Sequence, residues 1–280
     1  MATKQKIGLG TVQFGTDYGI SNKRGKTPVS EVSKILHTAR EHRVRILDTA
    51  SAYGMAEKVL GEHDLSGFRI VSKFMPSDED YSITVQLEKT LSDLNASSLY
   101  GYLAHRPQNL VETPETWTKL KKLRKDGKVR KIGFSLNSPG ELHHLLDMGM
   151  NPDIIQAPYS YFDRRFESEM QELQKDGCEI HARSAFLQGL FFTETDQLAG
   201  FFDSVKPIIK ELQGSVQQLP VKLLHFVLEK PFIDHVIIGV ETKDQLLENL
   251  KVESDLEQLP VLEIEFPEQI LTPSNWPKSL

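Results

Sequence analysis

Four side chains in the first half of the sequence could together transfer a proton. Asp48 ends an apolar run, Tyr53 follows in the small-residue segment TASAYG, Lys73 lies in RIVSKF and His105 lies in LAHRP. A buried lysine needs an acidic partner, and Asp48 could supply it while keeping Lys73 charged. A charged Lys73 near Tyr53 would stabilise the phenolate, which suits Tyr53 to act as a general acid. Each residue taken alone has a structural explanation, but the set of four favours acid–base chemistry.

Eight short apolar segments could position these residues. They have the length and β-branched content of strands and alternate with amphipathic helical patterns. The segments cover residues 6–10, 44–49, 69–74, 100–105, 130–135, 153–158, 179–184 and 235–240. Eight such units predict parallel strands joined by right-handed crossovers and closed into an α/β fold of the (β/α)8 TIM-barrel type. Because all strand carboxyl ends of a barrel share one mouth, the four side chains would meet there.

The alternative architecture is an open doubly wound sheet. Such a sheet normally carries G-x-G-x-x-G after its first strand, and GLGTVQFG here lacks that spacing. A length of 280 residues suits a single barrel domain spanning residues 1–280. Two segments depart from the alternation, and we expect an inserted helix over residues 193–215 and a surface strap over the Pro-rich tail 259–280.

The amino-acid composition limits the classes of partner that the chain is expected to bind. A net charge of −6 and a pI near 5.9 argue against nucleic acid or an acidic membrane surface. The sole cysteine excludes an intrachain disulfide, and no hydrophobic signal region or long apolar stretch is present. We therefore expect a soluble, cytoplasmic protein that is a monomer or a weak oligomer. No metal is expected at the site, since the sequence has no H-E-x-x-H or C-x-x-C motif.

The ordered set of Asp48, Tyr53, Lys73 and His105 resembles the catalytic tetrad of the aldo-keto reductase superfamily. The resemblance runs from GLGT at 8–11 through LDTASAYG, SKF, AHRP, IGFS and IIQAPYS to VIIGVETKDQLLENL. It implies a barrel enzyme that uses NAD(P)H to reduce an aldehyde or ketone to the alcohol. Tyr53 would donate the proton, Lys73 would assist it, Asp48 would hold Lys73, and His105 would orient the carbonyl oxygen.

The same resemblance implies a set of cofactor contacts. Ser135 and Gln156 would hold the nicotinamide carboxamide, the loop after the seventh strand would contact the pyrophosphate, and the last motif would contact the adenosine. Arg183 replaces an aromatic residue of the family, and its charge would favour the reduced cofactor. The implied contacts are Gly10, Thr11, Ser135, Gln156, Arg183, Ser184, Leu187, Gly189, Gly239, Glu241, Gln245, Glu248 and Asn249.

The choice between NADP(H) and NAD(H) stays open at this point. NADP(H) is the family default, and Lys243 could reach a 2′-phosphate. Glu241 would repel that phosphate and could accept hydrogen bonds from ribose hydroxyls instead. For the substrate, a small carbonyl or alcohol, the candidate contacts are Phe14 and Tyr18 after the first strand and Arg106 after the fourth.

Two other functions use the same residues. In a Schiff-base aldolase, Lys73 would be the nucleophile, although pairing with Asp48 would keep it charged and unreactive. A regulatory subunit that senses the nicotinamide cofactor would bind it tightly and turn over little.

Overall fold

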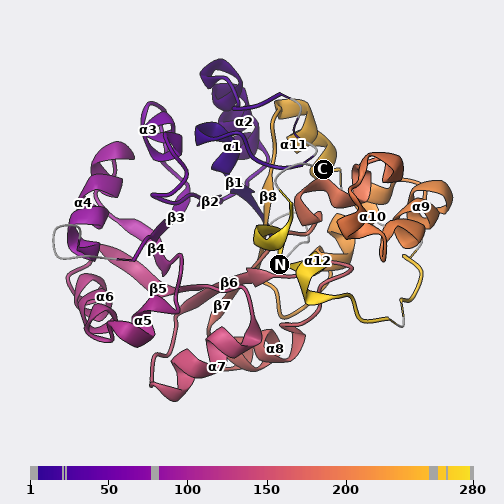
Figure 1. Ribbon diagram of the computed structural model, residues 1–280. Helices are drawn as coiled ribbons and strands as arrows, with labels where there is room; N and C mark the ends of the chain where they lie inside the picture. The colour runs from indigo at the N-terminus through magenta and orange to yellow at the C-terminus, as the bar shows by residue number, and fades with distance from the viewer. Residues whose placement is uncertain are drawn as a thin grey trace.

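The structure is a computed structural model that describes residues 6–20, 22, 24–76, 82–251, 258–262 and 264–277. Within these residues, parallel strands form a closed barrel in which β8 pairs with β1 (Figure 1). The strands are β1 (Ile7–Gly10), β2 (Ile46–Asp48), β3 (Arg69–Phe74), β4 (Leu99–Ala104), β5 (Val129–Ser135), β6 (Ile154–Pro158), β7 (Glu179–Arg183) and β8 (His235–Gly239). The barrel fold and the positions of all eight predicted strands are confirmed.

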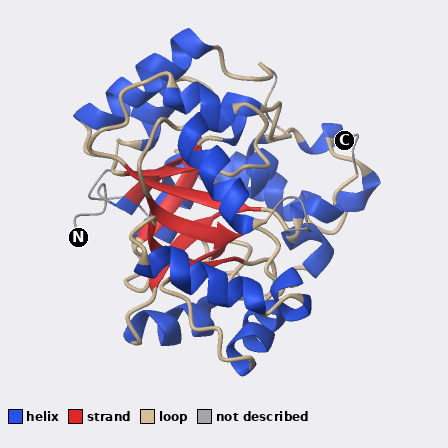
Figure 2. Cartoon of the chain, turned by 90° about the vertical axis from the view of Figure 1, so that its left-hand side faces the viewer, coloured by secondary structure: helices blue, strands red, loops and turns tan. Residues whose placement is uncertain are grey.

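Helices surround the strands on the outside of the barrel, as Figure 2 shows. Each buries an apolar face; α2, for example, buries Val32, Ile35, Leu36 and Ala39, the residues of the helical pattern in the sequence. The outer helices are α1 (Val12–Gly15), α2 (Val29–Glu41), α3 (Ala56–Gly61), α4 (Ile83–Asp93), α5 (Asn109–Glu112), α6 (Glu115–Lys125), α7 (Pro139–Asp147), α8 (Glu167–Lys175), α10 (Leu219–Leu228) and α11 (Lys243–Asn249).

The interior of the barrel changes character along its axis. Its centre holds a small cluster of buried aliphatic side chains, which we call the apolar middle layer: Ile46, Val71, Leu103, Ile154 and Ile237. Polar side chains occupy the carboxyl ends of the strands, beginning with Asp48 at the end of β2. Charged and polar side chains also occupy the amino ends, where Glu179 begins β7 and His235 begins β8. The apolar middle layer therefore separates two polar ends.

The insertion after β7 contains less helix than the sequence predicts. Residues 193–205 form only short 3-10 turns, η3 (Thr195–Gln197) and η4 (Gly200–Phe202), after the turn η2 (Leu187–Phe192). A regular helix, α9 (Lys206–Ser215), begins one residue before Pro207, where the missing amide hydrogen of proline costs no helical hydrogen bond. The prediction of a helix throughout residues 193–215 was therefore wrong for its first half.

The described part of the tail is not a mere surface strap. It contains α12 (Glu268–Leu271) and η5 (Pro273–Asn275), and it buries Ile270 and Trp276 in a second core together with the insertion. The indole nitrogen of Trp276 donates a hydrogen bond to the carbonyl of Ile270. Residues 263 and 278–280 of this tail lie outside the described residues. The tail and the insertion thus stabilise each other beside the barrel.

No helix within the described ranges is both long and apolar enough to cross a membrane. A single domain, a cytoplasmic location and a monomeric or weakly associating state stay predictions.

Candidate active site

A buried ion pair lies at the carboxyl ends of β2 and β3. Lys73 Nζ donates hydrogen bonds to both carboxylate oxygens of Asp48, at 2.8 and 2.7 Å, and to the carbonyl of Thr49 at 3.0 Å. The Lys73 and Asp48 side chains are only 1% and 4% exposed. Both ammonium and carboxylate therefore find their partners within the protein rather than in water, as buried charges require.

Lys73 is held in its charged form. Burial alone would lower the pKa of Lys73, but Coulombic attraction to Asp48 and Tyr53, together with hydrogen bonds to both, outweighs burial and raises the pKa. The Lys73 ammonium also lies 5.2 Å from the centre of the Tyr53 ring. A fixed positive charge consequently stands beside the tyrosine.

The backbone around Tyr53 depends on two glycines. A Cβ atom on Gly15 would clash with the Tyr53 carbonyl oxygen, and a Cβ on Gly54 would lie 2.7 Å from the Gly15 carbonyl oxygen. Gly54 also has a φ of +56°, in the left-handed region that favours glycine. Because both positions lack side chains, α1 packs closely against the loop that carries Tyr53.

His105 completes the group from the end of β4. Its ring meets the Tyr53 ring edge to face, with centroids 5.8 Å apart and an interplanar angle of 85°. Burial, followed by the positive charges of Lys73, Arg183 and Arg106, lowers the pKa of His105 to about 3. The imidazole is therefore neutral near pH 7 and can donate one hydrogen bond from one ring nitrogen.

Gln156 joins the group from β6 on the opposite wall. Its amide Nε2 donates a hydrogen bond of 2.7 Å to Asp48 Oδ1, which also accepts from Lys73. Gln156 is 1% exposed. The Asp48 carboxylate thus links the ammonium group to a side chain that the sequence resemblance assigns to the cofactor.

A cavity of about 610 Å³ opens over these residues. The sequence-predicted residues that line it are Gly10, Thr11, Tyr18, Asp48, Tyr53, His105, Arg106, Ser135, Gln156, Arg183, Ser184, Gly189, Gly239, Glu241, Gln245, Glu248 and Asn249. Lys73 lies buried beneath the cavity wall. The structure thus brings nearly the whole predicted site to one mouth.

Two predicted residues lie elsewhere. Phe14 is fully buried in the main core and does not line the cavity, because the short helix α1 turns its side chain inward. Leu187 is fully buried in the second core with the insertion. We therefore correct the sequence prediction by removing both side chains from the contacts with substrate and cofactor.

Arg183, the last residue of β7, is tied to the neighbouring loop. Its Nη2 donates to the carbonyl of Leu136 at 2.8 Å and to Asn137 Oδ1 at 2.7 Å. The backbone N–H of Asn137 donates a hydrogen bond to the Glu141 carboxylate, which fixes Asn137. The same carboxylate completes the capping box of α7 with Ser138. The guanidinium is therefore fixed at the mouth.

The loop after β7 carries unusual backbone conformations. Ser184, Leu187 and Gln188 have φ values of 64°, 43° and 52°, and Gly189 has a φ of 92°. Positive φ in side-chain-bearing residues is costly and tends to concentrate at functional sites. This loop borders the cavity where the resemblance implies pyrophosphate contacts.

Carboxylates gather at the far end of the cavity. Glu241 lines both this cavity and a smaller adjoining one, whose wall also includes Glu31, Asp244 and the exposed Arg24. Burial, opposed by Arg24 and by a hydrogen bond to Gln245, raises the pKa of Glu241. The nearby Lys243 Nζ lies 4.0 Å from Asp244 Oδ1. Glu31 likewise pairs with Lys34 at 3.0 Å, which leaves Glu241 as the carboxylate that borders both cavities.

Several lining residues were missed by sequence reasoning. They come from loop, insertion and tail positions without a motif: Gln13, Gln188, Phe192, Pro220, Leu271, Thr272, Pro273 and Ser274. The tail residues could not be found from local patterns because only tertiary packing with the insertion brings them to the mouth. The glutamines carried a weak signal as polar residues in loops that follow strands.

Fold and side chains together define a (β/α)8 barrel protein with a buried Lys73–Asp48 pair beside Tyr53 at the carboxyl ends of its strands. The sequence model of the Aldo/keto reductase family matches residues 6–264. The chain belongs to the aldo/keto reductase family.

Individual relatives agree with this assignment. Glyoxal reductase of Bacillus subtilis is 30% identical over 171 residues, covering 57% of this chain and 60% of that protein. NADPH-dependent D-xylose reductase of Meyerozyma guilliermondii is 27% identical over 252 residues, covering 75% and 76%. The holo form of an aldo-keto reductase from Bacillus halodurans has the same fold, with a TM-score of 0.72 at 20% identity and coverage of 91% and 88%. The chain spans 60% of the length of the glyoxal reductase.

Proposed function

We propose that this chain is an NAD(P)H-dependent oxidoreductase that reduces an aldehyde or ketone to the alcohol, with Tyr53 as the proton donor. The observation that carries the proposal is the buried Lys73–Asp48 pair, which holds a charged ammonium 5.2 Å from the Tyr53 ring at the mouth of the cavity. Family membership supports the same reaction class.

The cavity walls fit a nicotinamide dinucleotide. Gly10 and Gly239 line the cavity without side chains, and a Cβ on Gly239 would lie 2.5 Å from Gln13 Nε2. Ser135 and Gln156 offer polar groups near the acid–base residues, whereas Gln245, Glu248 and Asn249 offer them at the far end. Bound NAD(P)H would supply the hydride to the carbonyl carbon.

The protein residues supply the proton. Tyr53 gives its hydroxyl proton to the carbonyl oxygen, so that hydride and proton together convert the carbonyl to an alcohol. The Lys73 ammonium stabilises the phenolate left behind, and Asp48 keeps that ammonium in place. Neutral His105 donates a hydrogen bond that orients the carbonyl oxygen.

Local charge favours NADH over NADPH, in contrast to the family default. Glu241, Glu31 and Asp244 line the adjoining cavity, and among the described residues of its wall Arg24 is the one cation. The Glu241 carboxylate would repel a 2′-phosphate, whereas ribose hydroxyls could donate hydrogen bonds to it. At the other end, the fixed Arg183 cation favours the neutral reduced nicotinamide over the positively charged oxidised ring.

The substrate we propose is a small polar aldehyde. Tyr18 and Arg106 line the cavity near the acid–base residues, and Gln188 Nε2 donates a hydrogen bond of 2.8 Å to the Tyr18 hydroxyl. These groups suit a hydroxyl or a second carbonyl on the substrate. The names of two relatives, a glyoxal reductase and a D-xylose reductase, are consistent with this class.

The Schiff-base alternative is disfavoured by the raised pKa of Lys73, because a nucleophilic lysine must be neutral. We would test the reductase proposal by titrating the protein with NADH and NADPH and by following their oxidation with glyoxal and D-xylose. Tyr53→Phe should retain cofactor affinity and lose at least a hundredfold in kcat, since it lacks the acidic proton.

Tyr161→Phe provides the matched control for loss of a hydroxyl. The Tyr161 hydroxyl donates to the carbonyl of Pro260, outside the cavity, so this variant should keep full turnover. Absence of cofactor binding in the wild type would contradict the proposal. Tight binding without turnover of any aldehyde would favour the regulatory-subunit alternative instead.

A further inference from the structure

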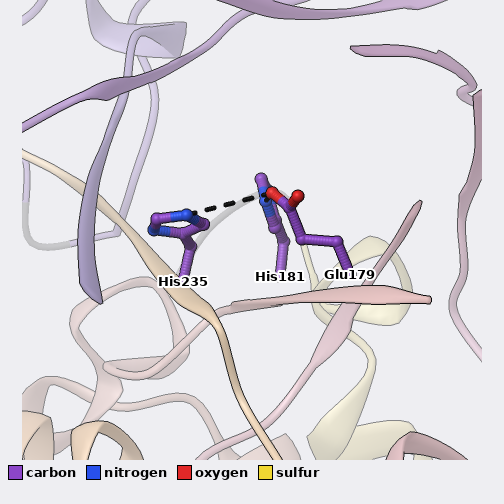
Figure 3. Close-up of side chains that lie close together, drawn as sticks. All are labelled: Glu179, His181 and His235. Atoms are coloured by element: carbon purple, nitrogen blue, oxygen red, sulfur yellow. Dashed lines mark hydrogen bonds and ion pairs between the residues drawn. The ribbon is translucent and has the colours of Figure 1, made fainter. Parts of the chain in front are cut away.

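Three potential metal ligands meet where the first half of β7 lies beside the start of β8, and none of them is among the residues that line the cavity. Glu179 and His181 stand two residues apart on β7, so both side chains point into the barrel, and His235 approaches from the start of β8 (Figure 3). Their ligand atoms all lie within 4.8 Å of one another. The side chains of Glu179, His181 and His235 are 11%, 0% and 6% exposed.

The spacing of the three side chains suits a small divalent cation. Glu179 Oε1 lies 2.7 Å from His181 Nε2 and 3.9 Å from His235 Nε2. Ligands about 2.1 Å from a tetrahedral metal lie about 3.4 Å apart, which falls between these two distances. The two imidazole rings meet at 78° with centroids 5.0 Å apart, so they approach from different directions. Small side-chain shifts would complete the geometry.

Hydrogen bonding within the protein leaves this group incompletely satisfied. His235 Nε2 lies 3.9 Å from Glu179 Oε1, which is too long for a hydrogen bond, although the residue as a whole is only 4% exposed. His181 Nδ1 is buried and has no hydrogen-bond partner among the described residues. An ion held by Glu179 Oε1 and the Nε2 atoms of both histidines would engage His235 Nε2, whereas His181 Nδ1 lies on the other side of its ring and does not bear on the site.

Hydrogen bonds to one oxygen orient the Glu179 carboxylate, as they commonly do for metal-bound carboxylates. Its Oε2 accepts hydrogen bonds from the Tyr100 hydroxyl and from Lys131 Nζ, each at 2.5 Å, so Oε1 is the oxygen that faces the histidines. Outer hydrogen bonds of this kind orient metal-bound carboxylates. The charge of Lys131 opposes that of a cation, so the affinity should be moderate rather than extreme.

We propose that Glu179, His181 and His235 bind a divalent transition metal ion, with zinc the best match, at the base of the barrel. Two imidazole nitrogens and one carboxylate oxygen are a ligand set that zinc accepts, and a water molecule can fill the remaining position. None of the three ligands lines the cavity, so the metal would stabilise the barrel without taking part in turnover.

The proposal can be tested on tag-free protein freed of metal with a chelator. We would titrate it with zinc chloride by calorimetry, count bound zinc by elemental analysis, and record the visible absorption with cobalt chloride. We expect one ion per chain and a rise of about 5 °C in melting temperature at a hundredfold excess over Kd. Cofactor affinity should be the same with and without zinc.

Substitutions assign the ligands. His181→Asn and His235→Asn should each weaken zinc binding at least tenfold. His143→Asn is the matched control, because His143 Nε2 lies 3.2 Å from the Glu169 carboxylate in a surface pair of the same kind, and it should bind zinc normally. If a ligand variant fails to fold, the cobalt spectrum of the wild type decides, since low-coordinate cobalt absorbs far more strongly than hydrated cobalt.

Two results would overturn the proposal. One is a wild-type protein that takes up no zinc and leaves the cobalt spectrum unchanged, which would mean that Tyr100, Lys131 and His181 satisfy Glu179 without an ion. The other is equal zinc affinity in all three histidine variants, which would place the ion elsewhere.

Discussion

Lys73→Met leaves the Asp48 carboxylate buried with Gln156 as its remaining side-chain hydrogen-bond donor. Both ion-pair partners are at least 96% buried at present, and Lys73 makes hydrogen bonds to both carboxylate oxygens. Breaking a buried pair by removing one partner costs about 3–5 kcal/mol. We therefore expect Lys73→Met and Asp48→Asn each to lower the free energy of unfolding by about that amount.

The double variant should recover much of this loss, because neither charge is then left buried without its partner. Urea unfolding followed by circular dichroism measures all four proteins of the double-mutant cycle, and the coupling energy should be about 2–3 kcal/mol. Turnover should stay lost in the double variant, since nothing then stabilises the Tyr53 phenolate. Single variants within about 1 kcal/mol of the wild type, or purely additive effects, would refute the view that the two charges depend on each other.

Three further predictions concern other parts of the site. The pKa of His105 is about 3 in the folded state and about 6.5 when unfolded, so the free energy of unfolding should fall as the pH drops from 6.5 toward 3. In His105→Gln, urea unfolding at pH 7 and at pH 4.5 should show a smaller decrease in that free energy than in the wild type. Glu241→Arg should shift the ratio of NADPH to NADH affinity at least tenfold toward NADPH in fluorescence titrations, and an unchanged ratio would remove Glu241 as the selector. Gly15→Ala should displace Tyr53 and lower kcat at least tenfold, whereas Gly214→Ala, where a Cβ meets nothing within 4 Å, should not.

Sequence patterns predicted the barrel well because each buried strand is a short apolar run between helical patterns. They also predicted that Asp48, Tyr53, Lys73 and His105 would lie together, since strand ends in a parallel barrel converge, whereas the catalytic roles of these residues stay a proposal. They failed where tertiary packing decides. The direction of Phe14 depends on the single turn of α1, and the contribution of Leu271 to the cavity depends on how the tail packs on the insertion.

The group at the base of the barrel shows the same limit. Glu179 and His181 carry a visible signal, because residues two apart on a strand share a face. Their third partner, His235, lies more than 50 residues later, and only the pairing of β7 with β8 places it opposite His181. A search for short metal-binding motifs therefore could not detect this group.

The apolar middle layer also decides where protons can travel. Its five side chains are at most 7% exposed and carry no group that donates or accepts a proton, so they offer no relay between the two ends of the barrel. In the proposed reaction, Tyr53 gives up one proton per turnover, and the cavity that Tyr53 lines supplies the replacement. Ligands that seal the cavity mouth would then cut off the proton supply as well as the substrate, which makes reprotonation of Tyr53 dependent on product release.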